Sequence, residues 1–240
     1  MIIGIISAMD SEHRQLAARL QEKKTTQEGA FCYVEGRVGN NTLVLTQCGI
    51  GKVNAAIGTA ELIRRYHPDC VISTGVAGGA VERMKPADVV AAAQTVYHDV
   101  YCGPDGSAYG QIQGMPLYYE SDESLLRHAQ RIASQQQNDE REGKIWCGLI
   151  ATGDRFVESA AELQQIRSHF PTTMAVDMES AAIAQTCYVE GKVPFISLRI
   201  VSDTPGAHPD NFAQYQNFWQ MMADRSFETT WRFVSTLGES

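Results

Sequence analysis

Residues 1–12 read MIIGIISAMDSE, an isoleucine run with one glycine that is followed at once by small and acidic residues. Apolar runs bounded in this way are typical of strands buried inside a sheet. Similar runs recur at residues 43–46, 70–73, 89–92, 145–150, 174–176 and 194–200. Segments with helical periodicity alternate with them, at residues 11–21, 52–66, 121–135, 159–170, 179–190 and from 211 to about 237. This alternation predicts an α/β sandwich around a mixed or parallel sheet.

The composition indicates one folded domain. The chain has 240 residues, of which 44% are hydrophobic, and this is enough to fill the core of a domain of that size. No stretch rich in Pro, Gly or Ser divides it, so we expect a single domain over residues 1–240. The 20 basic and 28 acidic side chains give a net charge of −8, which would repel nucleic-acid phosphates.

The N-terminus and the cysteines predict a cytoplasmic location. No stretch approaches the ~20 apolar residues of a membrane span, and the first residues lack the features of a signal peptide. The six cysteines stand singly, without the spacing of a zinc site, which favours reduced thiols in the core. We therefore expect no contact with a membrane or a nucleic acid.

Three carboxylates lie a few residues after predicted strands: Glu12, Glu179 and Asp203. Ligands of open α/β sheets bind at the carboxyl ends of strands, so we expect these side chains to converge there. Each alone would suit the first turn of a helix, where a carboxylate meets the helix dipole. Together they are typical of an acid–base site, in which burial keeps one carboxyl protonated while another stays ionised.

Two glycine-rich turns also follow predicted strands. Residues 49–52 read Gly-Ile-Gly-Lys, but a phosphate-binding loop needs four residues between its glycines and Ser or Thr in place of Val53. A dinucleotide-binding loop would need a third glycine in place of Asn54. Residues 75–79, Gly-Val-Ala-Gly-Gly, would let backbone N–H groups approach a ligand closely, although a plain turn could have the same sequence.

An ordered set of motifs resembles one family over nearly the whole chain. The motifs, numbered at their last residue, are Ser-Ala-Met-Asp-Ser-Glu12, Cys-Gly-Ile-Gly-Lys-Val-Asn-Ala-Ala56, Ser-Thr-Gly-Val-Ala-Gly-Gly79, Tyr-His-Asp99, Tyr-Gly-Gln111, Thr-Gly-Asp-Arg-Phe156, Val-Asp-Met-Glu179 and Arg-Ile-Val-Ser-Asp203. In order and spacing they resemble the 5′-methylthioadenosine/S-adenosylhomocysteine nucleosidases, within the nucleoside phosphorylase and hydrolase superfamily. The resemblance implies a three-layer α/β/α fold with a central mixed sheet, and a homodimer.

The resemblance also implies a reaction, the hydrolysis of the N-glycosidic bond of 5′-substituted adenosines without metal or cofactor. Its substrates would be 5′-methylthioadenosine, S-adenosylhomocysteine or 5′-deoxyadenosine, and its products adenine and a 5-substituted ribose. Asp203 would donate a proton to adenine N7, and Glu12 would activate the attacking water. Glu179, helped by Met178, would bind the ribose hydroxyls near the developing oxocarbenium ion.

Further contacts follow from the same resemblance. Phe156 would stack on adenine, the Val157 backbone would read its Watson–Crick edge, and Arg199 would order Glu12 and the water. The alternatives are a core side chain for Phe156 and a structural ion pair for Arg199. The remaining substrate contacts would be Met9, Ile50, Ala77, Gly78, Ser202 and Phe212.

Three positions depart from the pattern of the family. Val76 stands where serine is usual near the water, which removes one hydroxyl partner. Asp105 and Gln113 replace Phe and Pro in the segment 101–119, which normally lends apolar residues to the 5′-thioalkyl pocket of the neighbouring subunit. Polar residues there would favour polar 5′ groups, such as the amino-acid tail of S-adenosylhomocysteine.

Other functions remain open at this point. A nucleoside phosphorylase shares the fold, but it needs arginines around phosphate, and the loop after the first strand offers Asp10 and Glu12, which would repel phosphate. Hydrolysis is therefore favoured. A futalosine-type nucleosidase is an alternative in substrate, and a non-catalytic nucleoside-binding protein is an alternative in class, although a pure binder needs neither an acid nor a base.

Overall fold

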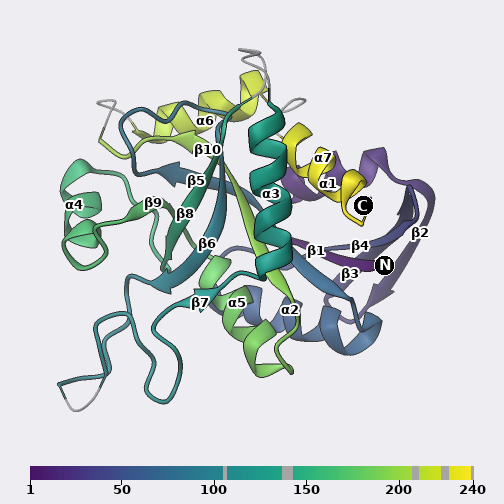
Figure 1. Cartoon of the computed structure of the whole chain (residues 1–240), viewed down its shortest axis with the longest axis horizontal. Coiled ribbons are helices and arrows are strands. Elements are labelled where there is room, and N and C mark those ends of the chain that lie inside the picture. The colour runs from purple at the N-terminus through teal and green to yellow at the C-terminus, as the bar shows by residue number, and fades with distance from the viewer. Residues whose placement is uncertain (105–106, 137–142, 207–210, 223–226, 239–240) are drawn as a thin grey trace.

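Figure 1 shows a computed structural model of the chain, which describes residues 1–104, 107–136, 143–206, 211–222 and 227–238. The side chains of residues 211–212 and 219–222 are outside this description.

The strands of these residues form one ten-stranded mixed sheet. They are β1 (Ile2–Ser7), β2 (Gln21–Glu28), β3 (Phe31–Val38), β4 (Asn41–Gln47), β5 (Cys70–Gly79), β6 (Val89–Tyr97), β7 (Tyr119–Glu120), β8 (Ile145–Thr152), β9 (Thr173–Asp177) and β10 (Phe195–Asp203). β1 is parallel to β4 and β5, and β8 is parallel to β6 and β9, whereas β3 is antiparallel to β2 and β4. The predicted central mixed sheet is confirmed.

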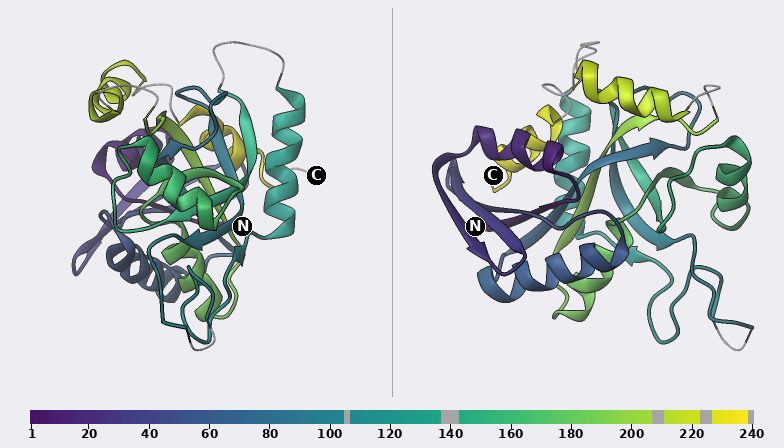
Figure 2. Two further views of the ribbon diagram at one scale, coloured as in Figure 1. Left: turned by 90° about the vertical axis from the view of Figure 1, so that its left-hand side faces the viewer. Right: turned by 180° about the vertical axis from the view of Figure 1, so that it is seen from behind.

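The helices cover the sheet on its two sides (Figures 1 and 2). They are α1 (Asp10–Arg19), α2 (Lys52–Tyr66), α3 (Glu123–Gln135), α4 (Ala160–His169), α5 (Ser180–Val189), α6 (Asn211–Met222) and α7 (Glu228–Thr236). In Figure 1, α2 and α5 pack side by side below the sheet, and α1 and α7 lie above β1 and β4. None of the helices in the described ranges has the length and apolarity needed to span a bilayer.

Three strands and the division of the C-terminal segment into two helices differ from the expectations drawn from the sequence. β2 reads QEKKTTQE, an almost entirely exposed edge strand without the apolar run of a buried one, and β3 and β7 were also unforeseen. The helix expected from residue 211 to about 237 is described as two, α6 and α7, on either side of residues 223–226. α6 packs against β10 and α7 packs against α3, and one straight helix cannot cover both.

β10 closes part of the sheet on itself. It is parallel to β5 and antiparallel to β6, and β5 and β6 are also joined through β9 and β8. Gly78 of β5 is the register partner of both Asp203 and Val176, which lie near the carboxyl ends of β10 and β9. The closure therefore brings the ends of three strands to one rim of the sheet.

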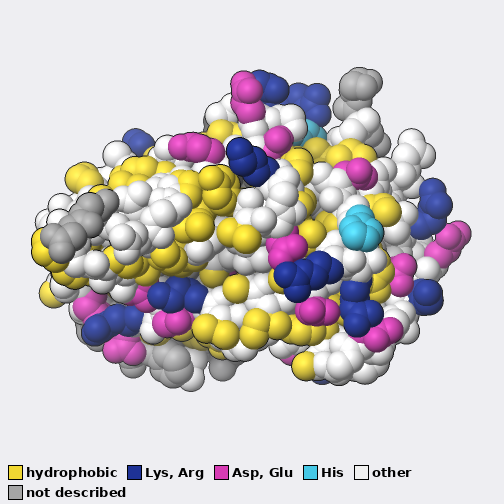
Figure 3. Space-filling model, turned by 90° about the horizontal axis from the view of Figure 1, so that it is seen from below, with side chains coloured by type: hydrophobic (Ala, Val, Ile, Leu, Met, Phe, Trp, Pro, Cys, Tyr) yellow, Lys and Arg dark blue, Asp and Glu magenta, His cyan; other side chains and the backbone are white. Residues whose placement is uncertain are grey.

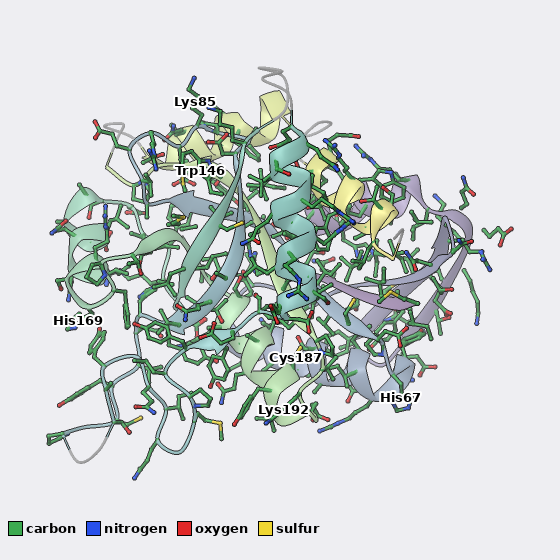
Figure 4. All side chains as sticks on the ribbon, viewed as in Figure 1. His67, Lys85, Trp146, His169, Cys187 and Lys192 are labelled. Atoms are coloured by element: carbon green, nitrogen blue, oxygen red, sulfur yellow. The ribbon has the colours of Figure 1, made fainter. Side chains whose placement is uncertain are left out.

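Asp88 fixes the opposite end of β6 against β8. Its side chain is buried, and Oδ1 accepts a hydrogen bond from the Lys144 backbone at 2.9 Å. Oδ2 accepts from the Lys85 backbone at 3.1 Å and from Trp146 Nε1 at 2.9 Å. Lys85 and Trp146 are labelled in Figure 4 beside this end of the sheet. One carboxylate thus accepts hydrogen bonds from three donors near the starts of β6 and β8.

We predict that Asp88→Ala lowers the free energy of unfolding by roughly 1–3 kcal/mol, because it leaves three partly buried donors without their acceptor. Urea unfolding followed by circular dichroism measures the loss. The control is Asp10→Ala, which removes an exposed ion pair with Arg14 and should change stability by less than about 0.5 kcal/mol. Equal losses in the two variants would contradict this account.

Candidate active site

Arg199 is a buried cation in the middle of β10, and its guanidinium reaches Asp177 at the end of β9. Its Nε lies 2.8 Å from Asp177 Oδ2, and its Nη1 lies 3.4 Å from Glu179 Oε2. Nη2 donates to Ser73 Oγ at 3.0 Å. Burial disfavours the charge, but Asp177, Glu179 and Glu12 outweigh burial and raise the pKa of Arg199. The guanidinium therefore stays charged and joins side chains from β5, β9 and β10.

Glu12, in the first turn of α1, is held by backbone donors. Its residue is 1% exposed. Oε2 accepts from the backbone N–H groups of Ala8 at 3.0 Å and Met9 at 2.9 Å, and Oε1 accepts from Val76 at 3.1 Å. Burial raises the pKa of Glu12, and Arg199 and these donors only partly offset it. Glu12 is therefore a stronger base than a surface glutamate.

Gly75 leaves the space in which Glu12 and Arg199 approach each other. A Cβ atom at this position would lie 2.6 Å from Arg199 Nη1 and 2.7 Å from Glu12 Oε1. Any side chain here would displace one of the two charges. The neighbouring Val76 acts on Glu12 through its backbone N–H, and its lack of a hydroxyl does not remove that donor.

The turn before α2 holds Glu179. Gly51 donates its N–H to Glu179 Oε1 at 2.9 Å, with a φ of 95° that favours glycine. Lys52 Nζ lies 2.7 Å from Asp99 Oδ2 in an ion pair. Burial raises the pKa of Glu179, and Arg199 opposes that rise. This glycine-rich turn therefore positions the carboxylate of Glu179, and its lysine, Lys52, is paired with the carboxylate of Asp99.

Asp203 ends β10 at a bulge. Val201 pairs with Ala77 and Asp203 pairs with Gly78, so that Ser202 is the extra residue. Ser202 Oγ donates to Asp203 Oδ1 at 2.6 Å. Asp203 is 2% exposed, so its carboxyl is withdrawn from bulk water.

A cavity of about 340 Å³ joins these groups. Its walls contain all the site residues predicted from the sequence except Phe212, namely Glu12, Asp203, Glu179, Arg199, Met9, Ile50, Ala77, Gly78, Phe156, Val157, Met178 and Ser202. The side chain of Phe212, in α6, is outside the described residues. Val76, which the resemblance placed near the water, also lines the cavity, and further lining residues were not predicted individually, namely Ala8, Arg155, Val176, Asp177 and Tyr215. Asp177 could have been found from its place in the Val-Asp-Met-Glu motif, whereas the sequence carried no signal for Tyr215.

Aromatic side chains also line the cavity. The rings of Phe156 and Tyr215 meet edge to face, with centroids 5.5 Å apart and planes at 73°. Tyr215 Oη lies 3.4 Å from Met9 Sδ. The walls of the cavity therefore combine buried carboxylates with aromatic rings, a combination that suits a flat ring joined to a hydroxylated group.

Gln113 and Asp105, in the segment 101–119, are the two polar residues expected near the 5′ pocket of a neighbouring subunit. Gln113 is exposed and lies outside the walls of the cavity, and Asp105 is outside the described residues. Within the described ranges, no group of three or more His, Cys, Asp or Glu side chains is arranged to hold a metal ion.

Known proteins share this sequence and fold. The family model described as the phosphorylase superfamily matches residues 2–235. A 5′-methylthioadenosine/S-adenosylhomocysteine nucleosidase from Geobacillus sp. is 38% identical over 237 residues, which cover 99% of each chain. The structure of S-adenosylhomocysteine nucleosidase from Streptococcus pyogenes, in complex with 5-methylthiotubericidin, is 37% identical with a TM-score of 0.90, and the match covers 99% of this chain and 97% of that one.

A second solved structure is equally similar. The 5′-methylthioadenosine/S-adenosylhomocysteine nucleosidase from Neisseria meningitidis, in complex with methylthio-immucillin-A, is 37% identical with a TM-score of 0.90. The match covers 98% of this chain and 99% of that one. The chain therefore belongs to the phosphorylase superfamily and, within it, to the 5′-methylthioadenosine/S-adenosylhomocysteine nucleosidase family.

Proposed function

We propose that this chain hydrolyses the N-glycosidic bond of 5′-substituted adenosines, giving adenine and a 5-substituted ribose. The observation that carries the proposal is the burial of Glu12, Glu179 and Asp203 around one cavity that Phe156 and Tyr215 also line. The relatives support it, because they are named as nucleosidases for 5′-methylthioadenosine and S-adenosylhomocysteine.

The adenine would lie against Phe156 in the cavity. Phe156 offers a ring face for stacking, and the backbone of Val157 offers an N–H and a C=O for the base edge. Asp203 would protonate N7, which makes adenine a neutral leaving group, and Ser202 would orient the carboxyl through its 2.6 Å hydrogen bond. The acid and the base-binding wall thus act on the same ring.

The ribose and the water would lie beside Glu179 and Glu12. Glu179, beside Met178, would accept hydrogen bonds from the ribose hydroxyls and place negative charge near the oxocarbenium ion that forms. Glu12 would take a proton from the attacking water, since burial makes it a better base than an exposed glutamate. Arg199 would act as a positioning residue, because it contacts Glu179 and faces Glu12 across Gly75.

Phosphorolysis is the nearest alternative, and the charges of the cavity disfavour it. Arg199 and Arg155 line the described cavity, and each is paired with a carboxylate, Arg199 with Asp177 and Arg155 with Glu162. An entering phosphate would compete with these carboxylates and would also meet Glu12. Hydrolysis by water needs no anion site.

Homodimer formation and a cytoplasmic location are also part of the proposal. Ile50, Val53 and Ile57, at the start of α2, are 53%, 68% and 51% exposed. Figure 3, seen from the side of α2 and α5, shows hydrophobic side chains spread over this face, which a second copy of the chain could cover. The six cysteines are free thiols, which suits a reducing compartment.

We predict that the purified protein releases adenine from 5′-methylthioadenosine and from S-adenosylhomocysteine in buffer without phosphate. The sugar product should be a free 5-substituted ribose, identified by mass spectrometry. If Asp105 and Gln113 reach a neighbour's 5′ pocket, kcat/KM should be shifted toward S-adenosylhomocysteine. A sugar 1-phosphate product, or an absolute need for phosphate, would place the protein among the phosphorylases.

We also predict the effect of replacing the proposed acid, Asp203, and the proposed base, Glu12. Asp203→Asn and Glu12→Gln should each lower kcat by on the order of a hundredfold or more, because a general acid or base contributes about 10²–10⁴ in rate. Both variants should still bind adenine, measured by calorimetry. The control Asp10→Asn changes an exposed carboxylate next to the same loop and should keep full turnover. Near-normal turnover in either test variant would remove that residue from the mechanism.

A further inference from the structure

The Tyr-His-Asp99 motif takes no part in the roles proposed above, and its last two residues contact the loop 153–157, which follows β8. The ring of His98 lies against Gly153, where a Cβ atom would be 2.6 Å from His98 Nε2. Asp99 Oδ2 accepts a hydrogen bond from the backbone N–H of Asp154 at 2.9 Å. The motif therefore supports this loop from outside the cavity of about 340 Å³, whose walls it does not line.

The loop 153–157 is also tied to the start of α2. Asp154 Oδ1 accepts a hydrogen bond from the backbone N–H of Lys52 at 2.8 Å. Gly51, the residue before the helix, has no side chain that could accept this bond, and a Cβ atom on it would lie 3.0 Å from Asp154 Oδ1. Asp154 therefore supplies, from another part of the chain, the carboxylate that commonly caps the N-terminus of a helix.

The side chain of Lys52 closes these contacts into a ring. Its Nζ donates to Asp99 Oδ1 at 2.8 Å and to Asp99 Oδ2 at 2.7 Å, and it lies 5.4 Å from the centroid of the Tyr97 ring. The side chains of Lys52 and Asp99 are only 22% and 26% exposed, so solvent screens this pair less than a fully exposed one. Lys52, Asp99 and Asp154 thus form a closed set of hydrogen bonds, which we call the Lys52 ring.

The Lys52 ring connects two parts of the candidate active site. Gly51 donates its N–H to Glu179 Oε1 at 2.9 Å, and the next residue, Lys52, donates its N–H to the loop 153–157. Glu179 is the carboxylate proposed to bind the ribose, and the loop includes the two residues proposed to bind adenine. Two consecutive backbone donors at one helix start therefore hold both binding elements.

We propose that Lys52, Asp99 and Asp154 are positioning residues that hold the loop 153–157 in register with Glu179, and so fix where the base of a nucleoside lies relative to its ribose. The inference rests on the function proposed above. A loop that is held in place before the ligand enters loses less conformational freedom on binding, so the Lys52 ring increases affinity. Its members line no part of the cavity and contact neither the proposed acid nor the proposed base in the described structure.

The test is calorimetric titration of the full chain with adenine, together with KM and kcat for 5′-methylthioadenosine. Asp99→Ala and Asp154→Ala should each weaken adenine binding about five- to tenfold and raise KM by a similar factor, because each opens the ring. In both variants kcat should change by less than about twofold, since the acid and the base keep their contacts. Asp154→Asn retains an oxygen that accepts from the Lys52 N–H, so it should bind adenine as the wild type does.

The matched control is an ion pair near the other end of α2, in which Arg64 Nη2 lies 2.6 Å from Glu190 Oε1. Glu190→Ala should leave adenine binding and KM unchanged. The proposal is overturned if Asp99→Ala and Asp154→Ala bind adenine as the wild type does, or if Asp154→Asn loses as much affinity as Asp154→Ala. A wild-type chain that binds adenine but releases none from 5′-methylthioadenosine would contradict the proposed function instead, and the titrations would still decide the role of the ring.

Discussion

The guanidinium of Arg199 is the group on which the arrangement of the site depends. A charge with 2% side-chain exposure is stable only if it has charged and hydrogen-bonded partners, and Asp177, Glu179 and Ser73 provide them. These partners come from the end of β9, from within β5 and from the residue before α5. Pairing one cation therefore ties these elements together, and it also fixes the carboxylates that face the cavity.

The carboxylates differ in their surroundings, and this difference is what an acid–base reaction requires. Glu12 is buried on three backbone donors with the guanidinium close by, whereas Asp203 lies beyond the bulge of β10 with Ser202 as a hydrogen-bond donor. Gly75 has no side chain, and this allows the approach of Glu12 to Arg199. The fold thus places two differently held carboxylates on the walls of one cavity, as the base and acid roles proposed for them require.

Much of this could be predicted from the sequence, because buried parallel strands are apolar throughout and their polar successors share one edge of the sheet. All seven apolar runs are strands, and Glu12, Glu179 and Asp203 line one cavity. β2 could not be predicted, since QEKKTTQE is polar and gains its pairing only from β3. The pairing of β10 with both β5 and β6 and the contact of Tyr215 with Phe156 join residues far apart in sequence, and no local pattern encodes them.

The most direct test of the role of Arg199 is the pH dependence of kcat/KM for adenine release from 5′-methylthioadenosine. Arg199 lowers the pKa of Glu12 and of Glu179, so removing its charge raises both pKa values. As the pH falls, the base then becomes protonated at a higher pH than in the wild type. Arg199→Gln should move the acidic limb upward by roughly one to three pH units, the usual effect of an adjacent guanidinium, whereas Arg199→Lys should keep it near the wild-type position. An Arg199→Gln enzyme with the wild-type acidic limb and wild-type turnover would contradict the account.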